Sequence, residues 1–498
     1  MRSAHTVSAV REAERALMAR LPEGALMRRA ATGLAVECAR LLPRVYGSRV
    51  VLLVGSGDNG GDALYAGALL AARGAAVYGM LAGPRAHEGG LAALRAAGGR
   101  VRTFLGDPSD GGELFDADLI IDGMLGIGGR GGLREPYGTL AVLAENAPAP
   151  VVAVDLPSGV DADTGEVPGH AVRADVTVTF GVLKPGLCVD PGADRAGRVH
   201  LVDIGLTPEL GGPDLIRPQA VDIAALLPKP GTESDKYRRG LLAVRAGSDH
   251  YRGAAVLTVG GALRTGVGMV RYGGASAAVD QVLARWPETV AVDLDPQGST
   301  RLGPGRVSAL VIGPGRGTHP ANADELHAVL DSDCPLLVDA DALTLLSGDG
   351  GTSLAQTLRE RTAHTLLTPH SGELARLLPG ADRSDIEARR LEHVRRVADE
   401  FDCTVLLKGS TTVIAQPGLP AAANPTGTPL LATAGSGDVL AGAIGALLAS
   451  GLPAYEAAMC GAYLHGRAAV LARGGAPVSA TDLLDGLPLA VAEARGTG

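Results

Sequence analysis

The chain has 498 residues, which is long for one hydrophobic core and predicts two or three domains. Its 45 basic and 54 acidic residues give a net charge of −9, which argues against a nucleic-acid binder or a polybasic membrane-surface protein. No apolar run is long enough to span a bilayer. Residues 1–21 mix Arg and Glu with apolar residues, a pattern that does not fit a secretory signal.

The five cysteines are scattered singly, without a CxxC pair or metal-ligand spacing, and indicate buried thiols in a reducing compartment. They are Cys38, Cys188, Cys334, Cys403 and Cys460. We expect a cytoplasmic, homo-oligomeric protein that binds small molecules and has no nucleic-acid or membrane partner.

In the first half of the chain, short apolar segments alternate with Ala-rich helical ones. Helices are predicted over 7–46, interrupted at Gly24 and Gly33, and again over 62–73 and 87–97. Strands are predicted at 49–54, 76–81, 119–122, 151–155, 176–180 and 199–202. Because these strands are apolar almost throughout, we expect burial on both faces and a largely parallel sheet.

A stretch rich in Pro, Gly and charge at 206–239 breaks this pattern, and we place a domain boundary near residue 212. A second series then has strands predicted at 241–245, 269–272, 310–312, 336–339, 365–368 and 404–407, with helices at 385–401 and 439–452. The sequence thus predicts two different α/β domains, residues 1–212 and 213–498. In both, polar clusters follow the strands, where parallel sheets bind ligands.

The first such cluster is GSGDNGGD, from Gly55 to Asp62, which formally contains GxGxxG between a strand and a helix. A conventional NAD site also needs an acidic residue about 20 positions later, at the end of the second strand. That strand ends in Met80-Leu81-Ala82-Gly83, so ordinary nicotinamide dehydrogenase chemistry is disfavoured. Alone, the Asn and Asp residues of the loop would also suit a helix cap.

Two further clusters favour a ligand site. Asp122 precedes a glycine-rich run, Gly126–Gly132, whose backbone N–H groups can approach phosphates closely. Asp155 ends a strand and is either a general acid or base or part of a structural turn. Asn59, Asp122 and Ser158 offer three oxygen ligands of the kind that a hard, weakly held cation prefers.

Residues 1 to about 212 resemble the YjeF N-terminal domain of the NAD(P)H-hydrate epimerase family. The motifs that carry this resemblance are DNGGD, IDGMLGIGGRG, VDLPSGVDADTG and TFGVLKPGL. The resemblance implies a Rossmann-like three-layer fold. It also implies that the hydrated dinucleotide is bound by Asp58, Asn59, Gly60, Gly61, Asp62, Gly126, Ile127, Gly128, Gly129, Arg130, Gly131, Gly132 and Asp155.

By the same resemblance, Asn59, Asp122 and Ser158 hold a potassium ion, and Asp155 acts at the hydrated carbon. The chain departs from the family at two positions. Asp58 replaces the usual Asn and adds negative charge near an anionic ligand, and Ala63 replaces the usual Gly.

The second half has no GxxxxGK[ST] segment and is not a P-loop nucleotidase. Instead, Asn424–Gly427 leads to Ala434-Gly435-Ser436-Gly437-Asp438 and a long apolar helix. Free N–H groups at a helix N-terminus favour developing phosphoryl charge, and Asp438 can accept the proton of a hydroxyl that attacks phosphate. An isolated segment of this kind also serves as a plain helix cap.

Three other residues follow predicted strands. Lys184 and Lys408, two of only four lysines, each precede a glycine-containing turn and are either functional or exposed charges at strand ends. His370, in LLTPHSGE, is interpreted as a substrate contact without a catalytic role. No HxxxH or HxH spacing supports zinc.

Residues 215–495 resemble the YjeF C-terminal domain, the NAD(P)H-hydrate dehydratases with a ribokinase-like α/β fold. The motifs are KYRRGLL, AGSDHYRGAAVL, ALRTGVGMVR, IGPGRG, DADAL, TPHSGELARLL and KGSTTVI. This resemblance implies nucleotide contacts from Lys408, Gly409, Ser410, Thr411, Thr412 and Gly437, and substrate contacts from Ala254, Gly315, His370 and Asp438. It also implies ADP, or ATP, as phosphoryl donor, with Mg²⁺ bridging the phosphates. Ser436 replaces the common Thr.

Together the two resemblances predict a bifunctional enzyme that epimerises hydrated NADH and NADPH at C6 and dehydrates the S form. Two alternatives stay open. A ribokinase-type small-molecule kinase with a non-catalytic, nucleotide-binding N-terminal domain would release a stable phosphorylated product. A nucleotide-sensing scaffold would bind the hydrate without turnover, although Asp155 and Asp438 argue against it.

Overall fold

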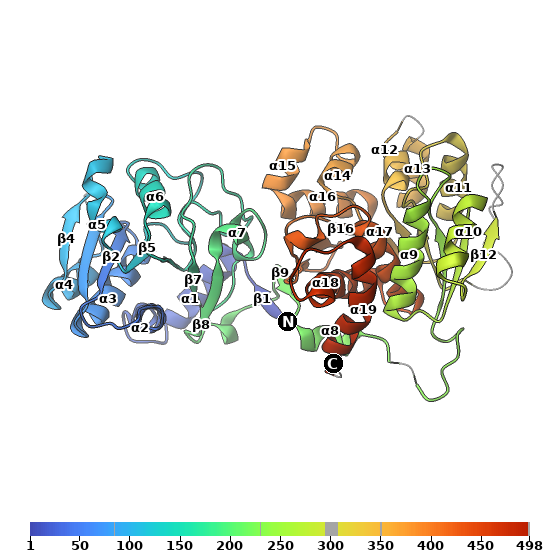
Figure 1. The fold of residues 1–498 in the computed structure, drawn as a ribbon. Helices are drawn as coiled ribbons and strands as arrows, with labels where there is room; N and C mark the ends of the chain where they lie inside the picture. The colour runs from blue at the N-terminus through green and yellow to red at the C-terminus, as the bar shows by residue number, and fades with distance from the viewer. Residues whose placement is uncertain (84, 230, 294–306, 349–350, 497–498) are drawn as a thin grey trace. The chain divides into compact units, whose positions relative to one another are not determined.

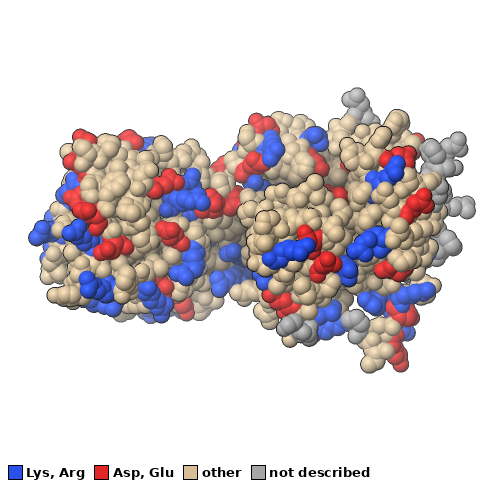
Figure 2. Space-filling view, in the orientation of Figure 1, with Lys and Arg blue, Asp and Glu red and all other residues tan. Residues whose placement is uncertain are grey.

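The computed structural model describes residues 1–83, 85–229, 231–293, 307–348 and 351–496. Its internal contacts divide the chain into two compact units, Arg2–Leu215 and Ile216–Gly498, the second together with Met1 (Figure 1). On the face drawn in Figure 2, basic and acidic side chains are interspersed. Within the described ranges, none of the helices combines the length and the apolar character needed to cross a bilayer.

The N-terminal unit contains a parallel sheet, as predicted. Its strand order is β4-β3-β2-β5-β6-β7-β8, and neighbouring strands are parallel. The strands of the unit are β1 (Arg2–Ala4), β2 (Arg49–Val54), β3 (Ala76–Leu81), β4 (Arg100–Thr103), β5 (Leu119–Gly123), β6 (Val151–Val154), β7 (Val176–Phe180) and β8 (Arg198–Val202). Its helices are α1 (Val7–Met18), α2 (Ala25–Leu41), α3 (Asp58–Ala72), α4 (Glu88–Ala96), α5 (Gly112–Phe115), α6 (Tyr137–Asn146) and α7 (Gly192–Ala196).

Helices cover both faces of this sheet. Successive side chains of a strand point to opposite faces. Leu52 of β2 lies in a core with residues of α1 to α4, whereas its neighbour Leu53 lies in a second core with Leu114 of α5 and Leu140 of α6. The N-terminal unit therefore has three layers, as the sequence predicted.

Two local predictions for this unit are wrong. Helix α3 begins at Asp58 rather than at residue 62, so the DNGGD motif forms its first turn. Gly33 lies inside α2 and does not interrupt it. A Cβ atom at Gly33 would lie 2.4 Å from Val202 Cγ1, so glycine allows α2 to pack closely on β8.

The C-terminal unit contains a second sheet, in which the order β9-β18-β17-β16-β15-β14-β13-β10-β11-β12 is found. In this sheet order, neighbouring strands are parallel from β16 through to β12. The pairs β16–β17 and β17–β18 are antiparallel. The strands are β9 (Leu215–Arg217), β10 (Leu241–Arg245), β11 (Met269–Gly274), β12 (Val290–Asp293), β13 (Ala309–Ile312), β14 (Leu336–Val338), β15 (Thr365–Leu367), β16 (Thr404–Leu407), β17 (Val413–Ala415) and β18 (Ala421–Ala423).

The helices of this unit cover a sheet whose central strands are wholly buried. They are α8 (Ala220–Leu226), α9 (Arg252–Thr265), α10 (Ser276–Arg285), α11 (Pro320–Leu330), α12 (Asp341–Ser347), α13 (Gly351–Arg359), α14 (Ser371–Leu377), α15 (Arg383–Ala388), α16 (Arg390–Phe401), α17 (Ser436–Ala449), α18 (Ala454–Arg473) and α19 (Ala480–Ala494). The buried helix predicted at 439–452 is α17, whereas the single helix predicted at 385–401 is two helices that meet at Arg389. All five cysteines are free thiols, and only Cys334 is not fully buried.

Candidate active sites

The polar residues predicted for the N-terminal site lie at one edge of the sheet. Asn59 is in the first turn of α3, which follows β2, while Asp122 is the last residue but one of β5 and Asp155 follows β6. These are the carboxyl ends of neighbouring parallel strands, where ligands bind in open α/β sheets. A Cβ atom at Gly126 would lie 2.8 Å from Asn59 Oδ1, so the Gly126–Gly132 segment begins against the first turn of α3.

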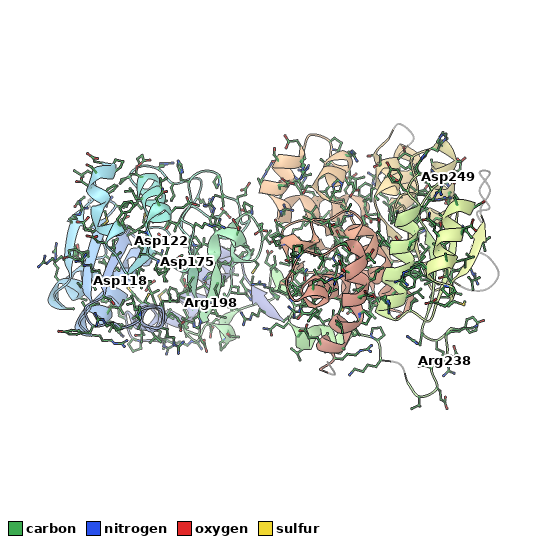
Figure 3. The ribbon with its side chains drawn as sticks, in the orientation of Figure 1. Asp118, Asp122, Asp175, Arg198, Arg238 and Asp249 are labelled. Carbon is green, nitrogen blue, oxygen red and sulfur yellow. The ribbon has the colours of Figure 1, made fainter. Side chains whose placement is uncertain are left out.

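Asp122 and Ser158 form a buried hydrogen-bonded pair (Asp122 is labelled in Figure 3). Ser158 Oγ donates to Asp122 Oδ1 at 2.6 Å, and the Ser158 amide donates to Asp122 Oδ2 at 2.8 Å. The Leu125 amide donates to Ser158 Oγ at 2.8 Å. Burial raises the pKa of Asp122 to about 6, although the hydrogen bonds from Ser158 lower it.

The donor set around Asp122 fits a monovalent cation. It consists of carboxylate, hydroxyl and amide oxygens, without the sulfur or imidazole ligands that zinc prefers. Asp122 is fully buried, and in the part of the chain that the structure describes no Lys, Arg or His side chain pairs with it. Among the described residues, no group of three or more His, Cys, Asp or Glu side chains could hold a metal ion.

Asp155 pairs with Lys184, a residue that the sequence left undecided. Lys184 Nζ lies 2.5 Å from Asp155 Oδ1 and is only 1% exposed. Thr179 Oγ1 and the Phe180 amide also donate to Oδ1, at 2.9 and 3.3 Å. No described group donates a hydrogen bond to Oδ2, so that oxygen is left for a ligand.

The backbone at Asp155 is also unusual. Its φ angle of 63° lies in the left-handed region, which non-glycine residues rarely adopt. Strain of this kind is found most often where the fold holds a functional side chain in a required direction. The conformation and the buried partner Lys184 together fix the Asp155 carboxylate at the end of β6.

Asp62 lies in the same region and is buried. Its Oδ1 atom has no hydrogen-bond partner. Burial raises the pKa of Asp62 well above its usual value, and the nearby Asp155, Asp58 and Glu14 raise it further. Asp62 was predicted as a site residue from the sequence, whereas Glu14, which comes from α1, was not singled out.

The residues predicted for the C-terminal site also lie where strands end. Gly315 follows β13, His370 follows β15, Lys408 follows β16, and Asp438 is in the first turn of α17. A Cβ atom at Gly315, where φ is 61°, would lie 2.7 Å from Ala254 Cβ. The structure therefore brings the predicted residue Ala254 of α9 against the Gly315 turn.

Lys408 is the centre of a group of acidic side chains. Its Nζ atom lies 2.7 Å from Asp339 Oδ1 and 3.9 Å from Glu373 Oε2. Burial, together with Asp339 and Asp341, raises the pKa of Asp438 to about 7, although Lys408 lowers it. Asp339 and Glu373 were not predicted as site residues, although the DADAL and TPHSGE segments that contain them were noted.

The loop after Lys408 approaches two glycine segments. A Cβ atom at Gly437 would lie 3.6 Å from Lys408 Nζ, and one at Gly427 would lie 2.9 Å from the Ser410 carbonyl oxygen. The predicted nucleotide-binding loop, residues 408–412, thus lies beside the start of α17 and the Asn424–Gly427 segment. Gly435, with φ 83°, precedes α17. The Ser436 amide donates to the Thr433 carbonyl oxygen, whereas among the described residues the Gly437 and Asp438 amides have no backbone acceptor and can bind an anion.

Two histidines differ in their surroundings. His370 caps α14, since its Nδ1 accepts a hydrogen bond from the Glu373 amide at 3.1 Å, and its side chain is 56% exposed. His465 of α18 was not predicted from the sequence. It is buried, its Nε2 has no hydrogen-bond partner, and burial lowers its pKa to about 4.

Comparison with known proteins identifies the family. Residues 242–488 match the family model described as NAD(P)H-hydrate dehydratase, and residues 23–186 match the model for the YjeF-related protein N-terminus. The bifunctional NAD(P)H-hydrate repair enzyme Nnr of Mycobacterium leprae is 46% identical, and the alignment covers 99% of this chain and 100% of that protein. The Nnr enzyme of Mycobacterium tuberculosis is 48% identical over 92% of this chain and 91% of that protein. The Nnr enzyme of Moorella thermoacetica is 37% identical, and the alignment covers 89% of this chain and 88% of that protein.

The C-terminal unit is also similar to a solved structure. The ADP/ATP-dependent NAD(P)H-hydrate dehydratase from Bacillus subtilis, co-crystallised with ATP and Mg²⁺, is 29% identical with a TM-score of 0.51. The match covers 55% of this chain and 97% of that one, and it confirms the predicted ribokinase-like α/β fold. The chain therefore belongs to the family of bifunctional NAD(P)H-hydrate repair enzymes.

Proposed function

We propose that this protein repairs hydrated NADH and NADPH, with one site in each unit. Water added across the 5,6-double bond of the nicotinamide ring leaves a hydroxyl on C6, as R and S epimers that cannot donate hydride. The N-terminal unit (residues 1–212) interconverts the epimers, and the C-terminal unit (residues 213–498) dehydrates the S form. The observation that carries this proposal is that each sheet edge holds an aspartate near a lysine, Asp155 with the buried Lys184 and Asp438 with the half-buried Lys408.

In the N-terminal site, the substrate phosphates bind the amides of Gly126–Gly132 and the first turn of α3. The C6 carbon is bonded both to the added hydroxyl and to the ring nitrogen. Removal of the hydroxyl proton therefore allows C6 to lose its configuration. Asp155 Oδ2 accepts that proton, while Lys184 holds Oδ1. The remaining predicted contacts, from Asp58 to Asp62, surround the same sheet edge.

Asn59, Asp122 and Ser158 would hold potassium, which supplies a fixed positive charge beside the phosphate-binding loop. We expect Asn59→Ala to raise the K⁺ concentration for half-maximal epimerisation by about tenfold or more, because an oxygen ligand is lost. The measurement is the conversion of R to S hydrate across a K⁺ titration at constant ionic strength. Asn146→Ala, which changes an exposed Asn of α6, is the matched control, and an unchanged titration for Asn59→Ala would rule out this ion site.

In the C-terminal site, Asp438 accepts the proton of the 6-hydroxyl, whose oxygen attacks the terminal phosphorus of the adenine nucleotide and displaces the shortened nucleotide. The C6–O bond then breaks, and phosphate leaves with the electron pair of that bond. Loss of a proton from C5 restores the double bond. The amides at the start of α17 stabilise the phosphoryl charge. When bound, Mg²⁺ supplies further neutralisation of the phosphates, and the oxygen-only side chains of Asp339 and Asp341 suit it.

Dehydration should depend on pH through Asp438. Its pKa is raised to about 7 by burial and by Asp339, and the carboxyl can accept a proton only when it is ionised. The rate at saturating S hydrate and nucleotide should therefore rise as pH increases through about 7 and level off above it. The measurement is recovery of 340 nm absorbance from pH 5.5 to 9, about a unit and a half or more on each side of this midpoint. A flat profile would contradict the assignment of Asp438 as the base.

The activity itself is tested with mixed hydrated NADH, supplied with ADP or ATP in turn. We expect both epimers to disappear and 340 nm absorbance to return, with ADP as the preferred donor. A kinase would instead accumulate a phosphorylated product without recovery of absorbance. Location in the cytoplasm and a homo-oligomeric state remain predictions, which fractionation and sedimentation would test.

A further inference from the structure

Helix α1 carries an acidic residue on its packed face. Val10, Ala13 and Leu17 are buried and recur at helical spacing, so they define the face that packs against the N-terminal unit. Glu14 lies three residues before Leu17 and four after Val10, on the same face, and is half-buried. Within the described residues its carboxylate makes no hydrogen bond or close ion pair, although burial of a charged group usually requires one.

The groups that act on Glu14 are those of the epimerase site. Burial raises the pKa of Glu14, and the carboxylates of Asp155 and Asp58 raise it further, while Lys184 and Arg11 lower it. These charges come from three elements as well as from α1 itself: the start of α3, the end of β6 and the segment after β7. Glu14 therefore shares its surroundings with Asp155, and these surroundings raise the pKa of its carboxyl.

A second contact places α1 at the same site. A Cβ atom at Gly128 would lie 3.3 Å from Arg11 NH2, so the guanidinium of Arg11 lies against the glycine-rich segment. Ile127 of that segment packs against the apolar core that includes Val10 and, together with Val7, against a second, smaller core. Guanidinium groups bind phosphate through charge-assisted hydrogen bonds, and this segment is the proposed phosphate-binding loop. Helix α1 thus brings Arg11 to the glycine-rich segment and, one turn later, Glu14 to the charges around Asp155.

We propose that α1 supplies two groups to the epimerase reaction: Glu14 as a proton-transferring residue and Arg11 as a phosphate contact. This inference rests on the proposed function of the N-terminal unit. Asp155 takes the proton of the 6-hydroxyl, the O–H electron pair forms a carbonyl at C6, and the C6–N1 bond breaks with its pair going to N1. Glu14 donates its proton to N1. Rotation about C5–C6 and reversal of these steps close the ring with the opposite configuration.

The test for Glu14 uses the full-length protein, purified R hydrate and no nucleotide, so that only epimerisation is followed. Glu14→Gln should lower kcat by about 10²-fold or more, with little change in KM, because a positioned acid contributes that much. In the unaltered protein kcat should fall as pH rises through the Glu14 pKa, and this limb should be lost in Glu14→Gln. Glu14→Asp should recover part of the rate. Glu12→Gln, on the exposed side of α1, is the matched control.

Substitution of Arg11 should change KM more than kcat, the reverse of what is expected for Glu14. Arg11→Gln removes a charge-assisted contact to a part of the substrate that does not react, so KM should rise by about 10- to 100-fold while kcat changes less. Arg15→Gln, an exposed arginine one turn further along α1, is the control. An unchanged KM in Arg11→Gln would remove the phosphate contact from the proposal.

The outcomes separate this inference from the proposed function. If the unaltered protein does not convert R into S hydrate, the proposed function of the N-terminal unit is wrong. If it does, and Glu14→Gln keeps the normal rate and pH profile, Glu14 transfers no proton and the inference is wrong. The thermal unfolding of the N-terminal unit, compared with that of the unaltered protein, reports whether each variant is folded, and dehydration of pure S hydrate reports that the C-terminal unit is intact. If Glu14→Gln does not fold, Glu14→Asp decides, since a shortened proton donor should lower kcat and shift the pH limb.

Discussion

Asp438→Asn is expected to lower the rate of S-hydrate dehydration by about 10²–10⁴-fold, the usual contribution of a positioned base. The amide cannot accept the 6-hydroxyl proton, whereas the amides at the start of α17 and the loop after Lys408 remain to bind phosphate. The loss should therefore fall on kcat rather than on KM for the nucleotide. The measurement is the initial rate of 340 nm recovery from purified S hydrate with saturating nucleotide.

The same variant should retain the interconversion of R and S hydrate, because that reaction is assigned to the other unit. Asp280→Asn, which changes an exposed Asp of α10, is the matched control and should keep both activities. Dehydration at the normal rate by Asp438→Asn would place the base elsewhere. Loss of both activities would instead point to a folding defect.

Asp155→Asn should produce the reverse pattern. Only the S epimer should be consumed from a mixture, and conversion of R to S should fall by about 10²–10⁴-fold once the uncatalysed epimerisation is subtracted. The physical reason is that Asp155 Oδ2 is the one carboxylate oxygen of the Asp155–Lys184 pair left for the substrate. Separation of the two epimers by chromatography over time gives the rate.

This substitution also removes the negative partner of a buried lysine. Breaking a buried ion pair typically costs about 3–5 kcal/mol, so the N-terminal unit of Asp155→Asn should unfold at a lower temperature. Activity is therefore measured below that transition, with S-hydrate dehydration as the sign that the C-terminal unit is intact. Asp116→Asn, which alters only an exposed ion pair with Arg49, is the control. Normal consumption of the R epimer would exclude Asp155 as the proton acceptor.

The sequence predicted both sheets and both sheet edges because buried parallel strands are apolar almost throughout. Strands β2, β3, β10 and β16 have the predicted bounds. The missed strands β4 and β12 lie at the edges of their sheets. Strand β4, RVRT, lacks this apolar character, whereas β12, VAVD, has it and was missed. The start of α3 was missed because DNGGD has the composition of a turn. Glycine at position 60 allows the helix to begin against Gly55, because a Cβ atom at Gly60 would lie 2.2 Å from the Gly55 carbonyl oxygen.

The lysine partners of Asp155 and Asp339 could not be predicted, because each lysine follows a different strand from its aspartate, far away in the sequence. Lys184 is 29 residues from Asp155, and Lys408 is 69 residues from Asp339, so no motif spacing links them. Only the pairing of the folded strands brings them together. Glu14 is different, since the sequence carried a signal for it: an acidic residue between Val10 and Leu17 on an otherwise apolar helical face.

The central claim is that two separate sites act in succession on the same damaged cofactor, and a mixing experiment tests it most directly. Pure R hydrate and nucleotide are given to Asp155→Asn, to Asp438→Asn, and to an equal mixture of the two variants. Neither variant alone should restore 340 nm absorbance faster than uncatalysed epimerisation allows, whereas the mixture should, because S hydrate released by one protein is dehydrated by the other. No recovery by the mixture, or full recovery by either variant alone, would contradict the account.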